Sequence, residues 1–233
     1  MTAGVLPTAG VLPRADVLPY PRRPRIAVLG AGHTGPVIAR VAMDAGYPVS
    51  IAASGDPGRI ELIAQVLAPG AEPRWAADAA GEADIVVLAI PLHKFATLDP
   101  SLVAGKLVVD TMNYWPPVDG VQEMFEDRAR GSSEIVAQRL PRSTVVKTLN
   151  HIGYHELDAE RRPAGSPERR ALGVASDDPG AVDAVAELID RIGYDAVRLP
   201  SLSGGRILEP GGPVFGASLR RADFELSVHA AAA

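Results

Sequence analysis

Three glycines near the start of the chain have a spacing that suits phosphate binding. Gly30, Gly32 and Gly35 form the pattern Gly-x-Gly-x-x-Gly, directly after an apolar run at residues 26–29. Helical spacing of apolar residues begins at Pro36, so the glycines lie in a turn between a buried strand and a helix. Gly30 permits a tight turn, Gly32 lets a pyrophosphate approach the backbone, and Gly35 lets the helix pack close to the strand. An ordinary strand–helix turn with chance glycines is the alternative.

Free backbone N–H groups and the positive end of a helix dipole make such a turn an anion site. Together with the strand before it and the helix after it, the pattern predicts dinucleotide binding. We expect cofactor contacts from the whole turn, which comprises Gly30, Ala31, Gly32, His33, Thr34 and Gly35.

The residues after the second expected strand, 49–53, favour NADP over NAD. A chain that prefers NAD usually carries Asp or Glu about 20 residues after the glycines, where the acid binds the ribose 2′-hydroxyl. Here the strand is followed by Ser54, and Arg59 comes shortly after. A small hydroxyl and a nearby cation suit a 2′-phosphate. Two alternatives stay open: Asp56 as the displaced acid, and Arg59 as an ordinary surface charge.

Polar and aromatic residues follow three later strands. Residues 84–90 read as a buried strand whose end, Ala89-Ile90-Pro91, we expect beside the nicotinamide half of the cofactor. His93 either touches that half or is a surface residue at a helix start. Strand 106–110 runs into a rigid loop at 111–117, and strand 144–149 delivers Asn150 and His151 to the same edge of the sheet. Ligands of open α/β sheets bind at that edge.

The alternation of apolar runs and helical patterns predicts a Rossmann-type α/β fold: a doubly wound, mostly parallel sheet with a small C-terminal α/β extension. We expect a flexible proline-rich arm at residues 1–24, a dinucleotide-binding domain at 25–150 and an extension at 151–233 that completes the substrate site. The arm repeats Thr-Ala-Gly-Val-Leu-Pro. Further helices are expected at 57–67, 76–81, 132–140 (capped by Ser133), 179–192, 201–210 and 215–226, a loop at 156–170, and strands at 171–175 and 195–199.

Composition narrows the class of protein. The formal net charge of −5 over 233 residues disfavours nucleic acid as a partner, because binding to a phosphate backbone needs a basic face. The chain has no cysteine, which excludes disulfides, a thiolate nucleophile and a cysteine-ligated metal. No metal site, secretory signal or apolar run long enough to span a membrane is evident. We therefore expect a cytoplasmic protein without a membrane partner, and a homodimer as the commonest assembly.

Four stretches carry a resemblance to a known family. They are residues 28–35, residues 84–91, the pair 133–137 with 145–150, and residues 202–210, which read Leu-Ser-Gly-Gly-Arg-Ile-Leu-Glu-Pro. In this order and at this spacing, residues 25 to about 220 resemble the NADPH-dependent oxidoreductases that reduce the deazaflavin coenzyme F420, and related dinucleotide-binding reductases. The arm lies outside the resemblance.

The resemblance implies roles for particular residues. The 2′-phosphate pocket of the family uses a serine, an arginine and a lysine. The serine falls on Ser54 and the lysine on Arg59, whereas the arginine falls on Gly55, so that one contact is missing. The nicotinamide wall falls on Ile90, Pro91 and Leu92, where many relatives carry tryptophan at the last position. The deazaflavin side falls on Met112, Asn113, Asn150 and His151.

The function that follows is hydride transfer between NADP(H) and a deazaflavin such as coenzyme F420, or a similar planar acceptor. Such a step needs positioning and exclusion of water more than acid–base help, so no catalytic acid or base is expected. The alternatives are an NAD(P)-linked dehydrogenase or reductase of another small substrate, and a non-enzymatic NADP(H)-binding protein. The first of these usually adds a helical domain of about 100 residues, which a chain of this length does not leave room for.

Overall fold

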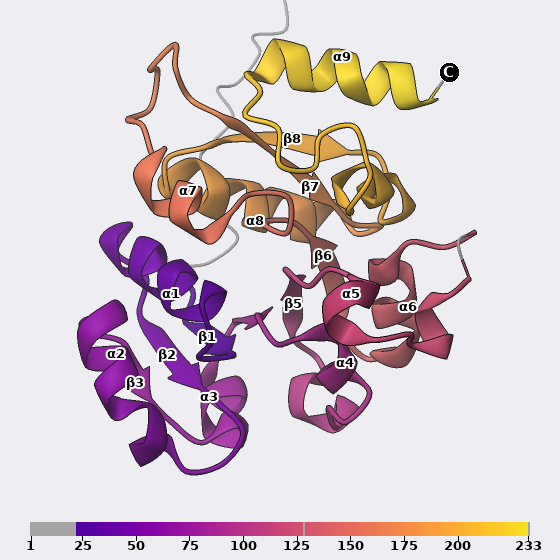
Figure 1. Cartoon of the computed structure of the whole chain (residues 1–233). Coiled ribbons are helices and arrows are strands. Elements are labelled where there is room, and N and C mark those ends of the chain that lie inside the picture. The colour runs from indigo at the N-terminus through magenta and orange to yellow at the C-terminus, as the bar shows by residue number, and fades with distance from the viewer. Residues whose placement is uncertain (1–21, 128, 233) are drawn as a thin grey trace, which may run out of the picture.

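A computed structural model describes residues 22–127 and 129–232. The prediction of a flexible arm falls almost wholly on residues 1–21 and so lies outside the described residues. The described chain forms one sheet of eight strands with helices on both faces (Figure 1). In this part of the chain, no helix is long and apolar enough to cross a membrane.

The strand order is β3-β2-β1-β4-β5-β6-β7-β8, in which the chain reverses direction across the sheet between β1 and β4. All neighbouring pairs are parallel except β6 and β7. The strands are β1 (Ile26–Leu29), β2 (Val49–Ala52), β3 (Glu72–Pro73), β4 (Ile85–Leu88), β5 (Leu107–Asp110), β6 (Thr144–Lys147), β7 (Ala171–Ala175) and β8 (Asp195–Leu199). This order confirms the predicted doubly wound, mostly parallel fold, whose ligand site lies at the reversal.

Nine α-helices lie within the described residues. They are α1 (Thr34–Asp44), α2 (Glu61–Leu67), α3 (Ala76–Glu82), α4 (Leu92–Phe95), α5 (Pro116–Asp119), α6 (Ser132–Arg139), α7 (Tyr154–Ala159), α8 (Pro179–Arg191) and α9 (Arg221–Ala232). Short 3₁₀ helices are η1 (Pro57–Ile60), η2 (Pro100–Val103), η3 (Glu123–Phe125) and η4 (Ser203–Leu208).

Alternate residues of each central strand enter two separate cores. In β1, Ile26 and Val28 pack with α1 and α8, whereas Ala27 and Leu29 face the opposite core, with α3, α4 and α6. Because both faces are covered, these strands are apolar throughout, with all four β1 residues buried. This two-sided burial explains why the strands were recognisable in the sequence.

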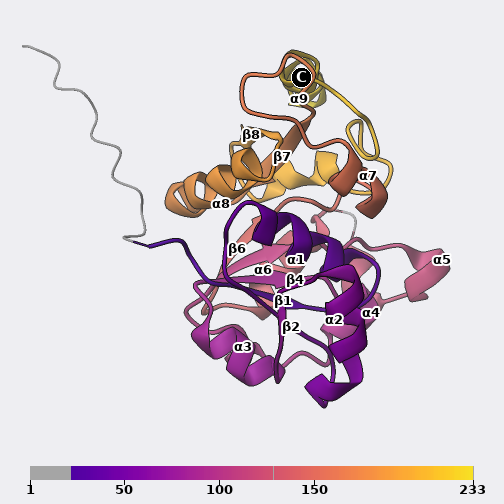
Figure 2. The ribbon, with the colours of Figure 1, turned by 90° about the vertical axis from the view of Figure 1, so that its left-hand side faces the viewer.

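The C-terminal elements add a third core at the far end of the sheet. Figures 1 and 2 both show β7, β8, α8 and α9 gathered at one end of the molecule, beyond β6. Here Leu208 of η4 and Phe224 of α9 pack against β7 and β8, on the face away from α8. β7 meets β6 through one antiparallel pair, Lys147 with Ala175.

The turn between β1 and α1 depends on two close approaches. A Cβ atom built on Gly35 would lie 1.8 Å from the Gly30 carbonyl oxygen, and one on Gly30 would lie 2.2 Å from the Ala89 carbonyl oxygen. Gly30 also has φ of +131°, which side chains rarely allow. By contrast, a Cβ on Gly32 would meet nothing within 4 Å. These are the three tasks that the spacing predicted.

Several predicted boundaries are wrong, for local reasons. Helix α1 starts at Thr34, two residues before the apolar pattern. The segment 57–67 is not one helix, because Asp56 caps a 3₁₀ turn that precedes α2. Gly131 caps α6, and Ser133 instead donates to a buried carboxylate. The last helix covers Arg221–Ala232 rather than 215–226.

Two further segments differ from the sequence prediction. Helix α7 begins at Tyr154 and runs into the expected charged loop at 156–170, because Gly153 caps the helix and Glu156 accepts a hydrogen bond from the Gly153 N–H. The expected loop at 111–117 runs into one helical turn, α5, where Pro116 suits the first helical position.

We predict that Gly35→Ala destabilises the protein, whereas Gly81→Ala does not. A methyl group at position 35 meets backbone at 1.8 Å, so α1 must move off β1, at a cost of about 1–3 kcal/mol. Gly81 lies in α3 with nothing within 4 Å, so alanine there gains about 0.5–1 kcal/mol of helix propensity. Urea midpoints of the two variants measure the contrast, and equal midpoints would contradict it.

Candidate functional site

The glycine turn presents unpaired N–H groups at the carboxyl end of β1. Within the described residues, the N–H groups of Ala31, Gly32 and His33 donate to no protein acceptor, and α1 begins at Thr34. The positive end of the α1 dipole lies at the same point. These donors suit a diphosphate, which is the role predicted for the turn.

An open cleft of about 440 Å³ adjoins this turn, across the carboxyl ends of β1, β2 and β4. Its walls include Gly30, Ala31 and Gly32 from the turn, Ser54 after β2, and Ala89, Ile90 and Pro91 after β4. The structure therefore brings seven of the predicted cofactor residues into one cleft, at the reversal of strand order. We call it the nucleotide cleft.

Ser54 lines the end of this cleft near β2, whereas Arg59, in η1, is not among the lining residues. Ser54 and Arg59 are exposed, and in the described chain neither forms a side-chain hydrogen bond or ion pair. Asp56 is also exposed, but its Oδ1 atom accepts the Gly58 N–H at 2.9 Å and caps η1. This cap gives Asp56 a structural task at the place where a free acid would bind the 2′-hydroxyl.

Two other predicted cofactor residues, His33 and Leu92, do not line the nucleotide cleft. His33 is exposed, and its ring stacks on Tyr154 of α7 with centroids 5.5 Å apart and planes at 19°. Leu92 is 2% exposed and packs in the core of α3, α4 and α6, so it lies behind the cleft wall rather than on it.

His93 connects the cleft wall to the loop after β5. Its backbone N–H and its ring Nδ1 lie 3.3 and 3.1 Å from Asp119 Oδ1, and Asp119 Oδ2 accepts the Trp115 N–H at 3.0 Å. The Asp119 side chain is 5% exposed. A single buried carboxylate thus joins the segment after β4 to the aromatic segment after β5.

That aromatic segment borders a second cleft, of about 540 Å³. Its walls carry three aromatic rings, Tyr114, Trp115 and Phe125, and two cations, Arg130 and Arg206. Ser132, Glu126 and Glu209 complete its polar lining. Because β4 and β5 are neighbours in the sheet, the two clefts lie along the same carboxyl edge. We call this one the aromatic cleft.

The four residues predicted on the deazaflavin side come together but are largely buried. Met112, Asn150 and His151 are 3%, 5% and 2% exposed, and none of the four lines the aromatic cleft. Asn113 and Asn150 exchange hydrogen bonds: Asn113 Nδ2 donates to the Asn150 carbonyl at 2.7 Å, and Asn150 Nδ2 donates to Asn113 Oδ1 at 2.9 Å. Asn150 Nδ2 also donates to the Leu208 carbonyl at 2.6 Å. These contacts fix the loop beneath the cleft.

His151 is held neutral by its surroundings. Burial, together with the charges of Arg170 and Lys147, lowers the pKa of His151 to about 3. The Gly173 N–H donates to Nε2 at 3.1 Å, so Nδ1 carries the proton and faces Asn150 Oδ1 at 3.3 Å. The imidazole therefore bonds β7 to the end of β6 without a charge.

Sequence reasoning missed a buried ion pair between β5 and β6. Lys147 and Asp110 are fully buried, with Nζ and Oδ2 3.4 Å apart. Asp110 also accepts the Met112 N–H at 2.9 Å and the Ser133 hydroxyl at 2.5 Å, while Lys147 donates to the Met112 carbonyl. The sequence did carry a signal for this pair, because a charged residue ends each of two otherwise largely apolar strands. The pair sets the path of the chain from β5 into the aromatic segment.

Lys94 was missed as well. It is an exposed cation that lines the nucleotide cleft, one turn into α4. No group of three potential metal ligands occurs among the described residues.

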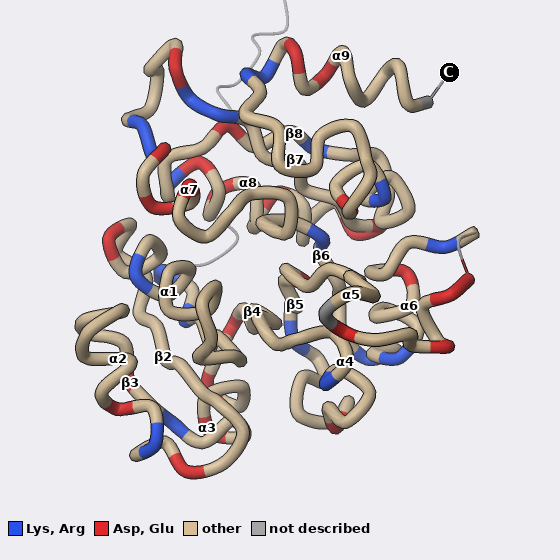
Figure 3. The backbone as a smooth tube through the Cα atoms, in the orientation of Figure 1, with Lys and Arg blue, Asp and Glu red and all other residues tan. Residues whose placement is uncertain are grey.

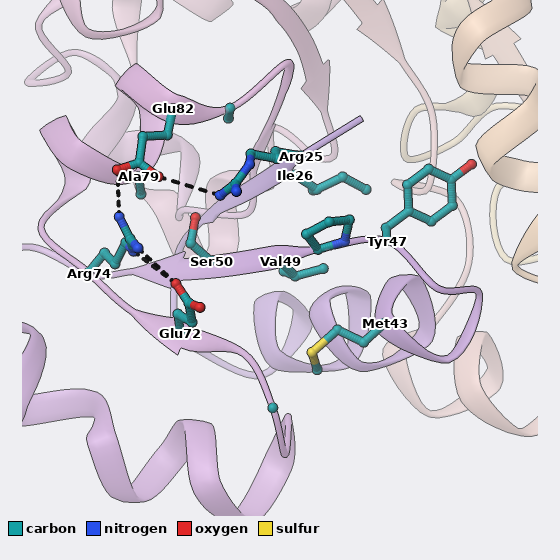
Figure 4. A pocket seen from close by; sticks show the side chains of 13 residues that line it. Arg25, Ile26, Met43, Tyr47, Val49, Ser50, Glu72, Arg74, Ala79 and Glu82 are labelled. Atoms are coloured by element: carbon teal, nitrogen blue, oxygen red, sulfur yellow. Dashed lines mark hydrogen bonds and ion pairs between the residues drawn. The ribbon is translucent and has the colours of Figure 1, made fainter. Parts of the chain in front are cut away.

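The opposite edge of the sheet has a smaller cavity, of about 140 Å³, at the amino ends of β1 and β2. Figure 4 shows its charged side chains paired with each other: Arg74 bridges Glu72 and Glu82 at 2.9 and 2.7 Å, and Arg25 also reaches Glu82. Since these charges are satisfied internally, we assign no ligand to this cavity.

Comparison with known proteins shows a family likeness over part of the chain. Residues 25–114 match the family described as NADP oxidoreductase, coenzyme F420-dependent. The predicted resemblance to this family is confirmed. The matched segment carries the glycine turn, the nucleotide cleft and the chain up to Tyr114, so the oxidoreductase class agrees with the site. No curated protein matches the chain in sequence.

Solved structures extend the likeness over most of the chain. A hypothetical protein from Sinorhizobium meliloti is 28% identical with a TM-score of 0.73, covering 84% of this chain and 95% of that one. A protein from Arthrobacter sp. FB24, described as a proposed F420-dependent NADP reductase, is 25% identical with a TM-score of 0.68, covering 85% and 100%. An imine reductase from Pseudomonas sp. shares the fold at 18% identity and a TM-score of 0.54, covering 80% and 60%.

We predict that His93→Ala loosens the aromatic segment without unfolding the protein. Loss of the ring removes one partner of Asp119, and an exposed pair of this kind contributes about 0.2–1 kcal/mol. The chain has two tryptophans, so a Trp75→Phe background makes Trp115 the only indole. Acrylamide quenching of Trp115 should rise in His93→Ala and stay constant in the control His229→Ala, which removes an exposed histidine of α9. Equal quenching in both variants would refute the link.

We predict that His151 makes stability fall as the pH is lowered below its ordinary pKa of 6.5. The unfolded chain takes up a proton at that pKa, whereas the folded chain does so only near 3, so the unfolded state binds more protons between these values. Between pH 8 and 5 this difference is worth about 2 kcal/mol. Urea unfolding at both pH values measures it.

The variant His151→Gln should lose less stability over the same pH interval, whatever its starting stability. His155→Gln, which removes an exposed histidine nearby, is the matched control and should keep the dependence of the wild type. A wild-type slope in His151→Gln would show that another group is responsible.

Proposed function

We propose that this protein transfers a hydride between NADP(H) and a planar acceptor of the deazaflavin type, such as coenzyme F420. The observation that carries the proposal is the pair of clefts on one sheet edge, one with a phosphate-binding turn and one walled by aromatic rings. The family match and the Arthrobacter relative support the same chemistry.

The proposal assigns the dinucleotide to the nucleotide cleft and to the exposed residues beside it. The N–H groups of residues 31–33 would bind the diphosphate, and Ser54 and Arg59 the 2′-phosphate. Lys94, which lines this cleft, would supply a cation there. Ile90 and Pro91 would bound the nicotinamide at the end of β4, next to the segment that carries Trp115.

The aromatic cleft would hold the acceptor. Tyr114, Trp115 and Phe125 offer faces and edges for a flat conjugated ring. Arg130 and Arg206 also line this cleft and pair with Asp127 and Glu134. The buried pair of Asp110 and Lys147 and the paired amides of Asn113 and Asn150 act as positioning groups, because they fix the chain below this cleft.

The proposed reaction places little demand on acid–base groups. Bound NADPH would supply a hydride, and the acceptor ring would take it up together with a proton from solvent, which leaves NADP⁺. The chain would hold the two rings in contact and exclude water from between them. Neutral His151 is buried and bonded on both nitrogens, so it has no free site for proton transfer.

The test is a spectroscopic assay with purified protein, NADPH and oxidised coenzyme F420. We expect the absorbance of the deazaflavin to fall, and a smaller rate when NADH replaces NADPH. Arg59→Gln should raise KM for NADPH about 10- to 100-fold, as loss of a charge-assisted hydrogen bond implies, and leave KM for NADH nearly constant. Arg191→Gln, on α8 and paired with Glu187, is the control.

Three outcomes separate the alternatives. Oxidation of NADPH by riboflavin or FMN but not by F420 would overturn the acceptor and retain the class of reaction. Tight binding of NADPH without turnover of any acceptor would favour a binding protein. An equal loss of NADPH and NADH affinity in Arg59→Gln would refute the 2′-phosphate site.

A further inference from the structure

A further cavity, outside both clefts, is lined by more arginines than acidic residues. It has a volume of about 260 Å³ and is lined by Arg162, Arg169, Arg170, Arg220, Glu160, Glu168, Ser218 and Leu219. It lies between the chain that links α7 to β7 and the segment that precedes α9, which are joined where the Ala171 N–H donates to the Leu219 carbonyl at 2.8 Å. Figure 3 shows Lys and Arg colouring concentrated on the loop between α7 and β7.

Two of these arginines are partnered by acids. Arg170 Nη1 lies 2.8 Å from Glu156 and 2.9 Å from Glu160, and Arg169 lies 3.4 Å from Asp195 and 3.8 Å from Asp190. These carboxylates offset the buried guanidinium charges in part.

The other two arginines have no acidic partner within the described residues. Arg162 donates to the carbonyls of Ala159 and Arg161, and Arg220 to that of Pro167. Four of the six charged lining residues are arginines, and Glu156, Asp190 and Asp195, which pair with Arg169 and Arg170, lie outside the lining. Helix α9 begins at Arg221, so the positive end of its dipole adjoins the same cavity.

The two buried arginines also have donors that the protein does not use. Arg169 is 6% and Arg170 3% exposed. In the described chain, Arg170 Nε and Nη2 are buried without a hydrogen-bond acceptor, and Arg169 Nε has only the Asp195 carboxylate, 3.4 Å away. Proteins rarely leave buried donors unpaired, and a cluster of them beside a cavity points to a ligand rich in acceptors.

We propose that this cavity binds a phosphate group, supplied as inorganic phosphate or as a phosphomonoester. A phosphate offers several acceptor oxygens and negative charge, which match the forked donors of arginine better than a neutral ligand would. Arg162 and Arg220 reach it from opposite chain segments, and the hydroxyl of Ser218, now bonded to Glu160 at 3.2 Å, is at hand. The site does not involve the nucleotide cleft, so it stands independently of the proposed function.

Thermal unfolding with and without phosphate tests the proposal. About 10 mM inorganic phosphate, against chloride at equal ionic strength, should raise the Tm of the wild type by about 2–4 °C. The double variant Arg162→Gln/Arg220→Gln should lose this rise in Tm, because it removes the two arginines that have no acidic partner in the described chain. It breaks no ion pair among the residues that the structure describes, since both side chains bond only to main-chain carbonyls there. Arg198→Gln, which removes an exposed arginine paired with Asp183 on β8, is the matched control.

The experiment distinguishes phosphate binding in this cavity from phosphate binding at the glycine turn. Phosphate bound at residues 30–35 affects the wild type and the double variant equally, so their difference reports the arginine cavity. A Tm rise that survives in the double variant, or no rise in the wild type, would overturn the proposal. If the double variant is too unstable for a Tm to be measured, the milder variant Arg220→Lys replaces it. Calorimetric titration of the wild type with phosphate then shows directly whether phosphate binds.

A second arm distinguishes the two sources of phosphate. Glycerol phosphate replaces inorganic phosphate under the same conditions, with glycerol as the neutral control. Equal stabilisation by both phosphates indicates a site open to phosphomonoesters. Stabilisation by inorganic phosphate alone indicates a closed site that admits only the free ion. Either result supports the proposed site, provided that the double variant abolishes the stabilisation.

Discussion

The contact between helix α1 and strand β1 is the constraint on which the site depends. A Cβ at position 35 would lie 1.8 Å from the Gly30 carbonyl oxygen, so the helix can sit this close only because residue 35 is glycine. The close packing aims the start of α1 at the end of β1 and leaves the N–H groups of residues 31–33 without protein acceptors. An anion site therefore arises from backbone alone, at the point where the strand order reverses.

A second constraint acts at the next strands and has a different origin. Asp110 and Lys147 are charged residues in a place where each alone would be costly, and together they bind the Met112 backbone and the Ser133 hydroxyl. Such a pair favours one path for the chain over others, because any other path leaves a buried charge unpaired. The aromatic segment that follows starts from this fixed point and is held at its far end by Asp119.

The sequence predicted the first of these regions well and the second poorly. Apolar strands buried on both faces and glycines with sterically fixed tasks leave local patterns, so β1, β2, β4 and the turn were recognisable. The aromatic cleft is assembled from residues 114–132 and 206–211, which meet only in the folded chain. Asn150 and His151 were correctly placed at the sheet edge, but their burial, which follows from bonds to Leu208 and Gly173, has no local signature.

This difference bears on how the two halves of the proposed reaction are encoded. In the proposed reaction, the diphosphate would be bound by main-chain donors where side chains are absent, so few substitutions in the glycine turn would preserve its binding. The acceptor side rests on side chains from separate loops above a buried polar scaffold, and Tyr114, Trp115 or Arg206 can change there without moving β5 or β6. A chain of this design keeps one redox partner while the other varies. Under the proposed function, the residues that choose the acceptor would therefore be those of the aromatic cleft, and not the buried amides below it.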